Sequence, residues 1–352
     1  MNNKMDFQFN WPLLGNDQVI KFLSRSLVNG KISGMYIFVG PDDIGKTTTA
    51  NYFTSALLCE NLKTGGPLPC GYCAACLQNQ VGQNSGFTDN FASVHPDYHL
   101  LKRASDKKTI EVDDVRAFIR SLEMSSFLNS YKVGVIKQAE TLNDHGFNSL
   151  LKTLEEPRSK VIFILIAKNI ESLPKTIISR AQVINFYPVK TDTIYDYLIE
   201  KYDLSRSKAK LFARLAAGRP ALAVKFMEDQ AFFDNYMARI SGLLKMTEMN
   251  VNQRFCVVEE LLNDKQTGQE ASRLVMRIIN SWQGVIRDLL LVSYGHPDLV
   301  QHELELESLN RIGVKITRER LLKFSDKALE SLSYLKANVN PKLVLESLVL
   351  NF

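Results

Sequence analysis

A glycine-rich segment, GPDDIGKTT, has the residue types and spacing of a phosphate-binding loop. Its two glycines permit a tight turn whose backbone amides point toward phosphate oxygens, and its lysine supplies positive charge for the outer phosphates. The first threonine after the lysine is of the type that ligates Mg²⁺ through its hydroxyl. The segment therefore predicts a nucleotide site formed by Gly40, Gly45, Lys46, Thr47 and Thr48.

Four of the five cysteines follow the pattern C-x10-C-x2-C-x2-C. In a reducing compartment this spacing favours a metal site over disulfides. Two overlapping C-x2-C steps put thiolates on one tight turn, and a fourth thiolate completes an S4 set that suits structural Zn²⁺. The predicted ligands are Cys59, Cys70, Cys73 and Cys76, whereas Cys256 is predicted to be a core residue.

The segment KVGVIKQAE stands where a phosphate-loop ATPase should carry its second acidic motif. In such ATPases an aspartate at a strand end holds Mg²⁺ through water, and in many a following glutamate polarises the attacking water. Lys137 and Gln138 occupy these positions and can do neither job. Glu140 comes two residues later, so a recruited acid remains an alternative. We expect this chain not to hydrolyse ATP.

Apolar runs between these motifs predict the elements that position them. Strands are predicted at residues 34–40, 97–102, 132–136, 161–167 and 181–187, with helices at 112–124 and 144–156. Strands that alternate with helices imply a parallel sheet covered on both faces. Beyond Pro188 the pattern has helical period to the end of the chain. The predicted fold is an α/β phosphate-loop domain followed by two all-α domains, with boundaries at 1–187, 188–233 and 234–352.

Length and composition agree with a multidomain globular protein. A chain of 352 residues holds two or three domains at about 150 residues each. A hydrophobic fraction of 45% and a charged fraction of 23% exclude a disordered or fibrous class. The net charge of +5 suits a surface that faces nucleic acid without requiring one.

The sequence gives no sign of a membrane segment. The N-terminus lacks the basic start and apolar run of a secretory signal. The longest apolar run, VIFILIA, is far shorter than the roughly 20 residues that cross a bilayer, so it is read as a buried strand. We expect a cytoplasmic protein without membrane partners.

Several further motifs mark a resemblance that spans almost the whole chain. They are PCGYCAAC, HPDYHLL, TIEVDDVRAF, NSLLKTLEEP, LPKTIISRAQ and NVNPKLVLESLVL. With the glycine loop, they resemble the clamp-loader AAA+ proteins of bacterial DNA polymerase III, and among these the delta prime subunits. The resemblance implies an AAA+ P-loop domain with a zinc-binding insertion at 1–187, a helical lid domain at 188–233 and a helical collar domain at 234–352 that joins a pentamer.

The resemblance also distinguishes two kinds of subunit. Members that hydrolyse ATP, of the gamma/tau type, carry Asp-Glu where Lys137 and Gln138 stand and Thr where Lys168 or Asn169 ends a strand. They carry a phosphate-sensing arginine where Ala221 follows the GRP turn. The chain also stops without the long C-terminal extension of tau. These differences favour a delta prime, or stator, role.

In delta prime subunits a Ser-Arg pair projects into the nucleotide site of the neighbouring gamma subunit. Arg180 of ISRAQ matches that arginine, although Ala181 stands where the family usually has cysteine. The resemblance therefore implies an arginine finger supplied in trans, because a guanidinium can neutralise charge on a transferred phosphoryl group. It implies gamma/tau and delta as partners, with the sliding clamp and primer-template DNA reached through the complex. The holoenzyme is a DNA-directed DNA polymerase, but this chain itself is not expected to be catalytic.

The retained glycine loop predicts weak or moderate binding of ATP or ADP and leaves open whether Mg²⁺ accompanies it. Two alternatives remain. One is a working gamma-type clamp-loader ATPase in which Glu140 or another acid holds the metal. The other is a zinc-centred DNA-binding module, although the segments around the cysteines are not notably basic.

Overall fold

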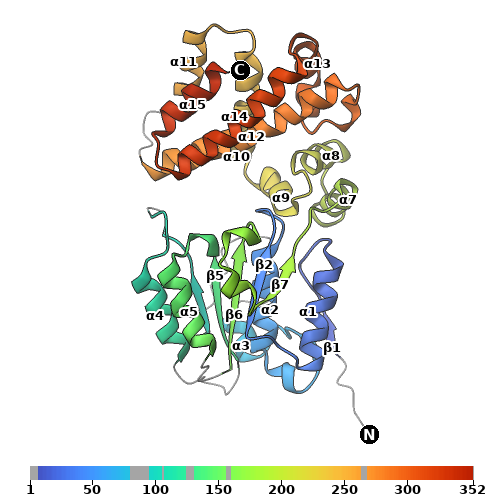
Figure 1. The fold of residues 1–352 in the computed structure, drawn as a ribbon. Helices are drawn as coiled ribbons and strands as arrows, with labels where there is room; N and C mark the ends of the chain where they lie inside the picture. The colour runs from blue at the N-terminus through green and yellow to red at the C-terminus, as the bar shows by residue number, and fades with distance from the viewer. Residues whose placement is uncertain are drawn as a thin grey trace. The chain divides into compact units, whose positions relative to one another are not determined.

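The computed structural model describes residues 7–79, 95–104, 107–123, 131–155, 160–262 and 268–351 (Figure 1). By its internal contacts the chain divides into two compact units. The first comprises Met1–Asp203 and Gly218–Val224, and the second Leu204–Ala217 and Lys225–Phe352. The finer division into three domains stays a prediction.

The first unit is built on a five-stranded sheet in which every pairing is parallel, with strand order β4-β5-β6-β2-β7. The strands are β2 (Met35–Val39), β4 (Tyr98–Leu101), β5 (Lys132–Lys137), β6 (Val161–Ala167) and β7 (Gln182–Asn185). All residues of β2 and β6 are buried, as expected for strands with helices on both faces. The predicted parallel sheet is therefore confirmed, and each predicted strand lies within two residues of an observed one.

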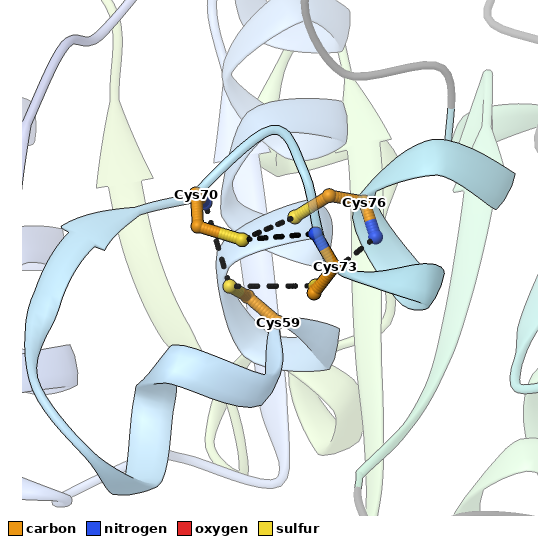
Figure 2. Close-up of side chains that lie close together, drawn as sticks. All are labelled: Cys59, Cys70, Cys73 and Cys76. Carbon is orange, nitrogen blue, oxygen red and sulfur yellow. Dashed lines mark hydrogen bonds between the residues drawn. The ribbon is translucent and has the colours of Figure 1, made fainter.

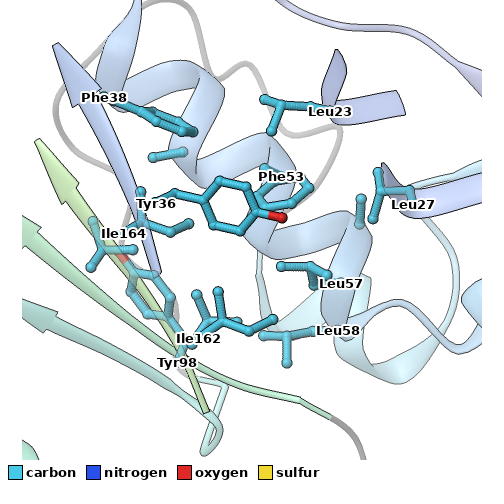
Figure 3. Close-up of a cluster of buried hydrophobic side chains, with 14 of the residues drawn as sticks. Leu23, Leu27, Tyr36, Phe38, Phe53, Leu57, Leu58, Tyr98, Ile162 and Ile164 are labelled. Atoms are coloured by element: carbon cyan, nitrogen blue, oxygen red, sulfur yellow. The ribbon is translucent and has the colours of Figure 1, made fainter. Parts of the chain in front are cut away.

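Helices cover both faces of this sheet. They are α1 (Asp17–Asn29), α2 (Lys46–Leu58), α3 (Ala74–Gln78), α4 (Val112–Glu123), α5 (Asp144–Glu155) and α6 (Lys175–Ile178), with short 3-10 turns η1 (Glu60–Lys63), η2 (Ala139–Thr141) and η3 (Ile170–Ser172). Helix α7 (Thr191–Tyr202) follows β7 in the chain. One apolar cluster joins α1 and α2 to the face that carries Tyr36, Phe38 and Ile164 (Figure 3). A second cluster joins α4 and α5 to the opposite face, which carries Ile37 and Ile136.

A short strand pair that the sequence did not reveal ties the N-terminal segment to the cysteine region. Strand β1 (Phe7–Phe9) pairs in parallel with β3 (Gly66–Leu68). The Tyr52 hydroxyl of α2 donates to the carbonyl of Leu68 at 2.6 Å and accepts from the amide of Asn10 at 2.8 Å. Trp11 lies against the Tyr52 ring, with centroids 4.4 Å apart. The ring and hydroxyl of Tyr52 therefore hold both strands.

The second unit contains helices throughout its described part. They are α8 (Arg206–Leu215), α10 (Gln230–Met246), α11 (Val251–Leu262), α12 (Gln269–Ser293), α13 (Leu306–Lys315), α14 (Arg318–Lys336) and α15 (Pro341–Leu350), with turns η4 (Pro297–Leu299) and η5 (Glu303–Glu305). Helix α9 (Pro220–Glu228) contributes to both units. Cys256 is exposed on α11, so its prediction as a core residue was wrong, because Val258 faces the interior instead.

A buried polar network holds the segment between α12 and α13. The Asp288 carboxylate, fully buried in α12, accepts from the backbone amides of Gln301 (2.9 Å) and His302 (2.8 Å). It also contacts His302 Nδ1 at 2.7 Å, while His302 Nε2 lies 2.9 Å from the Tyr236 hydroxyl of α10. Because buried polar groups are costly unless paired, this network fixes the position of the connecting segment.

None of the helices in the described parts of the chain is long and apolar enough to cross a membrane.

Candidate functional site

The predicted phosphate loop lies between the end of β2 and the start of α2. Gly40 has φ +150° and Gly45 has φ +101°, and both belong to the region of backbone space that favours glycine. A Cβ on Gly40 would lie 2.6 Å from the carbonyl oxygen of Phe186, and one on Gly45 would lie 2.6 Å from Leu13 Cδ1. The loop therefore needs glycine at both positions, as the motif predicts.

Helix α2 begins without a side-chain cap, since Gly45 is its N-cap residue. Its first intrahelical bond runs from the Thr49 amide to the Gly45 carbonyl at 2.9 Å, so the preceding amides of the first turn have no partner within the helix. Thr47 and Thr48 are half-buried there. Such a helix start attracts anions through its amides and the helix dipole.

Lys46 lies at the centre of this loop. Its ammonium group donates to the backbone carbonyls of Gly40 and Pro41, and the residue is only 6% exposed. Burial lowers the pKa of Lys46, while the nearby Asp42 and Glu140 carboxylates act in the opposite direction. The loop thus positions a buried cation beside the amides of α2, which is an arrangement that can bind phosphate.

The end of β5 carries no carboxylate. Lys137 is the last residue of the strand, and the exposed Gln138 side chain accepts from Arg103 Nε at 3.2 Å. Glu140 follows in η2 and has a buried Oε2 without a hydrogen-bond partner. Glu140 is therefore the first acid after the strand end in the chain, as the recruited-acid alternative requires, and its carboxylate interacts electrostatically with Lys46.

A second lysine reaches the loop from β6. Lys168 comes directly after this strand, and its ammonium group lies 2.5 Å from Asp42 Oδ2. Strand and loop are adjacent here, because the Gly40 amide donates to the Ala167 carbonyl at 3.4 Å. Both side chains of this ion pair are about half exposed, so it adds little stability. Its consequence is that Asp42 already has a cationic partner.

Two further contacts, which the motifs did not predict, join other segments of the chain near the loop. The Asn16 side chain, in the turn before α1, exchanges hydrogen bonds with the backbone of Tyr187 at 2.8 and 3.0 Å. The Ala221 amide at the start of α9 donates to the Asp43 carbonyl at 3.0 Å. Asp43 itself has φ +61°. Ala221 thus lies against the loop, where its methyl side chain offers no charge to a ligand.

The residues around the loop fit a polyphosphate but fit Mg²⁺ poorly. Mg²⁺ prefers carboxylate, hydroxyl and phosphate oxygens in near-octahedral geometry. The Thr47 hydroxyl is available as one such ligand, but the strand-end position that normally supplies the acid holds Lys137. Asp42 is paired with Lys168. The site therefore lacks the strand-end acid that would hold Mg²⁺.

Arg180 lies away from this loop, after α6 and before β7. Its side chain is exposed, and Nη1 donates to the Thr176 carbonyl at 3.2 Å. The role of Arg180 toward a neighbouring subunit stays a prediction. An exposed guanidinium on a short helical turn is nevertheless accessible to another protein.

The four predicted cysteine ligands gather in one cluster, with their sulfurs all within 4.8 Å of one another (Figure 2). Cys59 follows the last residue of α2, Cys70 lies just after β3, Cys73 is the N-cap residue of α3, and Cys76 lies within α3. The Sγ atoms of Cys59 and Cys73 are 4.0 Å apart, and those of Cys70 and Cys76 are 3.8 Å apart. The spacing predicted from the sequence therefore brings all four thiols together.

This cluster fits a tetrahedral zinc ion. Four Zn–S bonds of about 2.3 Å place sulfurs about 3.8 Å apart, close to the observed separations. The amides of Cys70, Cys73 and Cys76 point at the sulfurs of Cys59, Cys70 and Cys73 at 3.3–3.4 Å, which stabilises thiolates. The pKa of Cys59 is lowered to about 5, mainly because the Cys76 thiol hydrogen-bonds to its thiolate. With four sulfur ligands no position remains for a reacting water, so a zinc ion here would be structural.

The cysteine cluster and the phosphate loop lie at opposite ends of α2. The helix has 13 residues, so its ends are about 20 Å apart at 1.5 Å per residue. The cluster therefore cannot contact a phosphate bound at the loop. It holds β3, which pairs with β1.

Comparison with known proteins finds subunits of DNA polymerase III among the similar proteins. A solved structure of a DNA polymerase III gamma subunit-related protein from Thermotoga maritima matches 95% of this chain and 98% of its own, with 16% identity and a TM-score of 0.44. DNA polymerase III subunit delta' of Bacillus subtilis is 26% identical over 95% of this chain and 94% of its own length. Subunit tau of the same organism is also 26% identical, but the match covers 59% of tau.

The family model described as "DNA polymerase III, delta subunit" matches residues 15–190, which is half of the chain. This range contains the phosphate loop, the cysteine cluster and Arg180. The chain belongs to the clamp-loader subunit family of bacterial DNA polymerase III, and its first unit has a parallel α/β sheet with a phosphate loop.

Proposed function

We propose that this chain is the delta prime, or stator, subunit of the DNA polymerase III clamp loader, and that it helps to load the sliding clamp onto primed DNA. The similarity to subunit delta' covers nearly the full length of both chains, which supports this assignment. The similarity to tau is equally strong per residue, so the choice between them depends on the site.

The observation that carries the proposal is the replacement of the metal-binding and water-polarising acids at the end of β5. Lys137 is a cation, and Gln138 is engaged by Arg103 and lacks the charge to polarise water. Lys168 adds a second cation at the end of the neighbouring strand. A site with this composition binds phosphate without supplying the groups that activate water. The chain therefore holds ATP or ADP weakly or moderately without appreciable turnover.

In this proposal the catalytic contribution of the chain goes to its neighbour. Arg180 acts as an arginine finger in the ATP site of the adjacent gamma/tau subunit. Its exposed position after α6 supports this role, as does the family resemblance of ISRAQ. A planar guanidinium that pairs with the transferred phosphoryl group explains why arginine is the required residue.

The other parts of the chain serve assembly in the same proposal. The four cysteines hold a structural Zn²⁺ that fixes the insertion after α2. Residues 188–233 form a lid domain, and residues 234–352 form the collar that contacts gamma/tau and delta. Sliding clamp and primer-template DNA are reached through the assembled complex.

The alternative is a gamma-type clamp-loader ATPase, and one observation favours it. The buried Oε2 of Glu140 has no hydrogen-bond partner and lies near Lys46, so it is a candidate metal ligand. Steady-state ATP turnover by the purified chain, with Lys46→Ala as the control, separates the two functions. We expect no turnover above that of Lys46→Ala. A rate that Lys46→Ala and Glu140→Gln both abolish would establish the gamma-type function instead.

A further inference from the structure

We infer that the phosphate loop of this chain binds nucleotide in its metal-free form, with lysines on the side of the site where other phosphate-loop proteins hold Mg²⁺. The inference rests on the nucleotide binding proposed above. It states which form of the ligand is bound, namely free ADP or ATP and not the complex of either nucleotide with Mg²⁺.

The period of the strands determines which side of the sheet each lysine faces. Alternate residues of a strand point to opposite faces. In β5, Val133 and Val135 pack in the cluster that contains α2, whereas Ile136 packs on the opposite face. Lys137 therefore falls on the α2 side, together with the phosphate loop.

The same alternation places Lys168. In β6, Ile162 and Ile164 pack on the α2 side (Figure 3), as does Ile166, so the next position of that parity is Lys168. Its ion pair with Asp42 confirms that its ammonium group reaches the loop. In the sheet, β6 lies between β2 and β5. Lys137, Lys168 and Lys46 therefore lie at or beyond the ends of three adjacent strands.

The carboxylates near the loop, Asp42, Asp43 and Glu140, are balanced by lysines. Asp42 pairs with Lys168, and all three carboxylates interact electrostatically with Lys46. A divalent cation beside Lys137 and Lys168 would be repelled by both. Ammonium groups donate hydrogen bonds directly to phosphate oxygens. They can therefore supply the positive charge that Mg²⁺ supplies elsewhere, and they need no oxygen ligands from the protein.

The test is the affinity of the full-length chain for ADP and for ATP, measured by titration calorimetry in excess EDTA and again in excess Mg²⁺. We expect binding in EDTA that is at least as tight as in Mg²⁺. Lys137→Asp restores an acid at the strand end, so its affinity should become higher in Mg²⁺ than in EDTA by about tenfold, equivalent to a 1.4 kcal/mol difference.

Lys63→Asp is the matched control, because Lys63 lies beyond the opposite end of α2. Its affinities should keep the wild-type order in the two buffers. Tighter binding of the wild type in Mg²⁺ by about tenfold or more would overturn the inference, while nucleotide binding itself would stand. Loss of that enhancement in Glu140→Gln would then identify Glu140 as the metal ligand. Absence of binding in both buffers would overturn the inference together with the proposed nucleotide binding.

Discussion

At the scale of single residues, the type of side chain at a few strand ends decides what this site can do. The backbone of the phosphate loop keeps the features that bind phosphate, including Gly40, Gly45 and the buried Lys46. Lys137 and Lys168 change the charge of its surroundings. The loop and the loss of the acid at 137 could be predicted from the sequence. The Lys168–Asp42 ion pair could not, because it depends on the adjacency of β6 and β2.

Replacement of Gly40 by alanine tests the geometry of the loop. The new Cβ would collide with the Phe186 carbonyl, and the backbone would be strained at positive φ. We expect Gly40→Ala to lower the free energy of unfolding by about 2–4 kcal/mol, the sum of a strain and an overpacking cost. Urea unfolding followed by circular dichroism measures this change. Gly30→Ala is the control, because Gly30 also has positive φ but no atom lies within 4 Å of the added Cβ.

We expect Gly30→Ala to cost only about 1 kcal/mol, from backbone strain alone. Equal losses in the two variants would show that the contact with Phe186 does not constrain the loop.

At the scale of elements, the sequence predicted the long segments well and the short ones poorly. The strands of the parallel sheet and helices α4 and α5 follow strong apolar patterns. The β1–β3 pair joins three-residue strands that are far apart in the sequence, and GPL has no strand-like alternation. The prediction that Cys256 is a core residue failed because α11 packs only a narrow face against the interior, and Val258 is its one buried residue. The cysteine cluster was predictable since its spacing alone determines which thiols can meet.

The zinc ion proposed for the cysteine cluster is expected to order the elements attached to that cluster. Cys73→Ser should lose the bound zinc, measured by metal analysis of the purified chain. Because the cluster holds β3, and β3 pairs with β1, hydrogen exchange should become faster at residues 7–9 and 66–78. The buried strands β2 and β6 should keep their protection.

Cys256→Ser is the matched control for this experiment, since Cys256 is exposed and remote in sequence from the cluster. It should retain zinc and the wild-type exchange pattern. Zinc retained at the wild-type level in Cys73→Ser would rule out the four-thiolate site.

The buried network around Asp288 makes a prediction for the second unit. Asp288→Ala removes the acceptor for two backbone amides and for His302 Nδ1, all buried. We expect the free energy of unfolding to fall by about 3–5 kcal/mol, the range for removing one partner from a buried hydrogen-bonded charge cluster. Thermal unfolding with Asp298→Ala as control checks it, because Asp298 is exposed in the same connecting segment. A similar melting temperature for both variants would exclude a structural role for the network.

At the scale of the whole molecule, the chain combines a phosphate loop with a strand end, that of β5, which carries Lys137 and Gln138 instead of acids. In the proposed clamp loader this combination makes sense if catalysis occurs at the interface with a neighbour. The parallel sheet and the helical second unit could be predicted from apolar periodicity. The partner that receives Arg180 could be inferred only from family resemblance, because an exposed arginine does not by itself identify what it contacts.

The most direct measurement is the ATPase rate, stimulated by clamp and primer-template DNA, of a complex assembled from this chain with gamma and delta. We compare wild type with Arg180→Ala, and use Lys175→Ala as a control because Lys175 is exposed on α6, which ends just before Arg180. Loss of the arginine finger should slow ATP hydrolysis at the adjacent site by about 10³-fold or more. The total ATPase rate of the complex should then fall by the fraction that this site contributes. Lys175→Ala should leave the rate unchanged. An unchanged rate for Arg180→Ala in a complex that assembles normally would contradict the account.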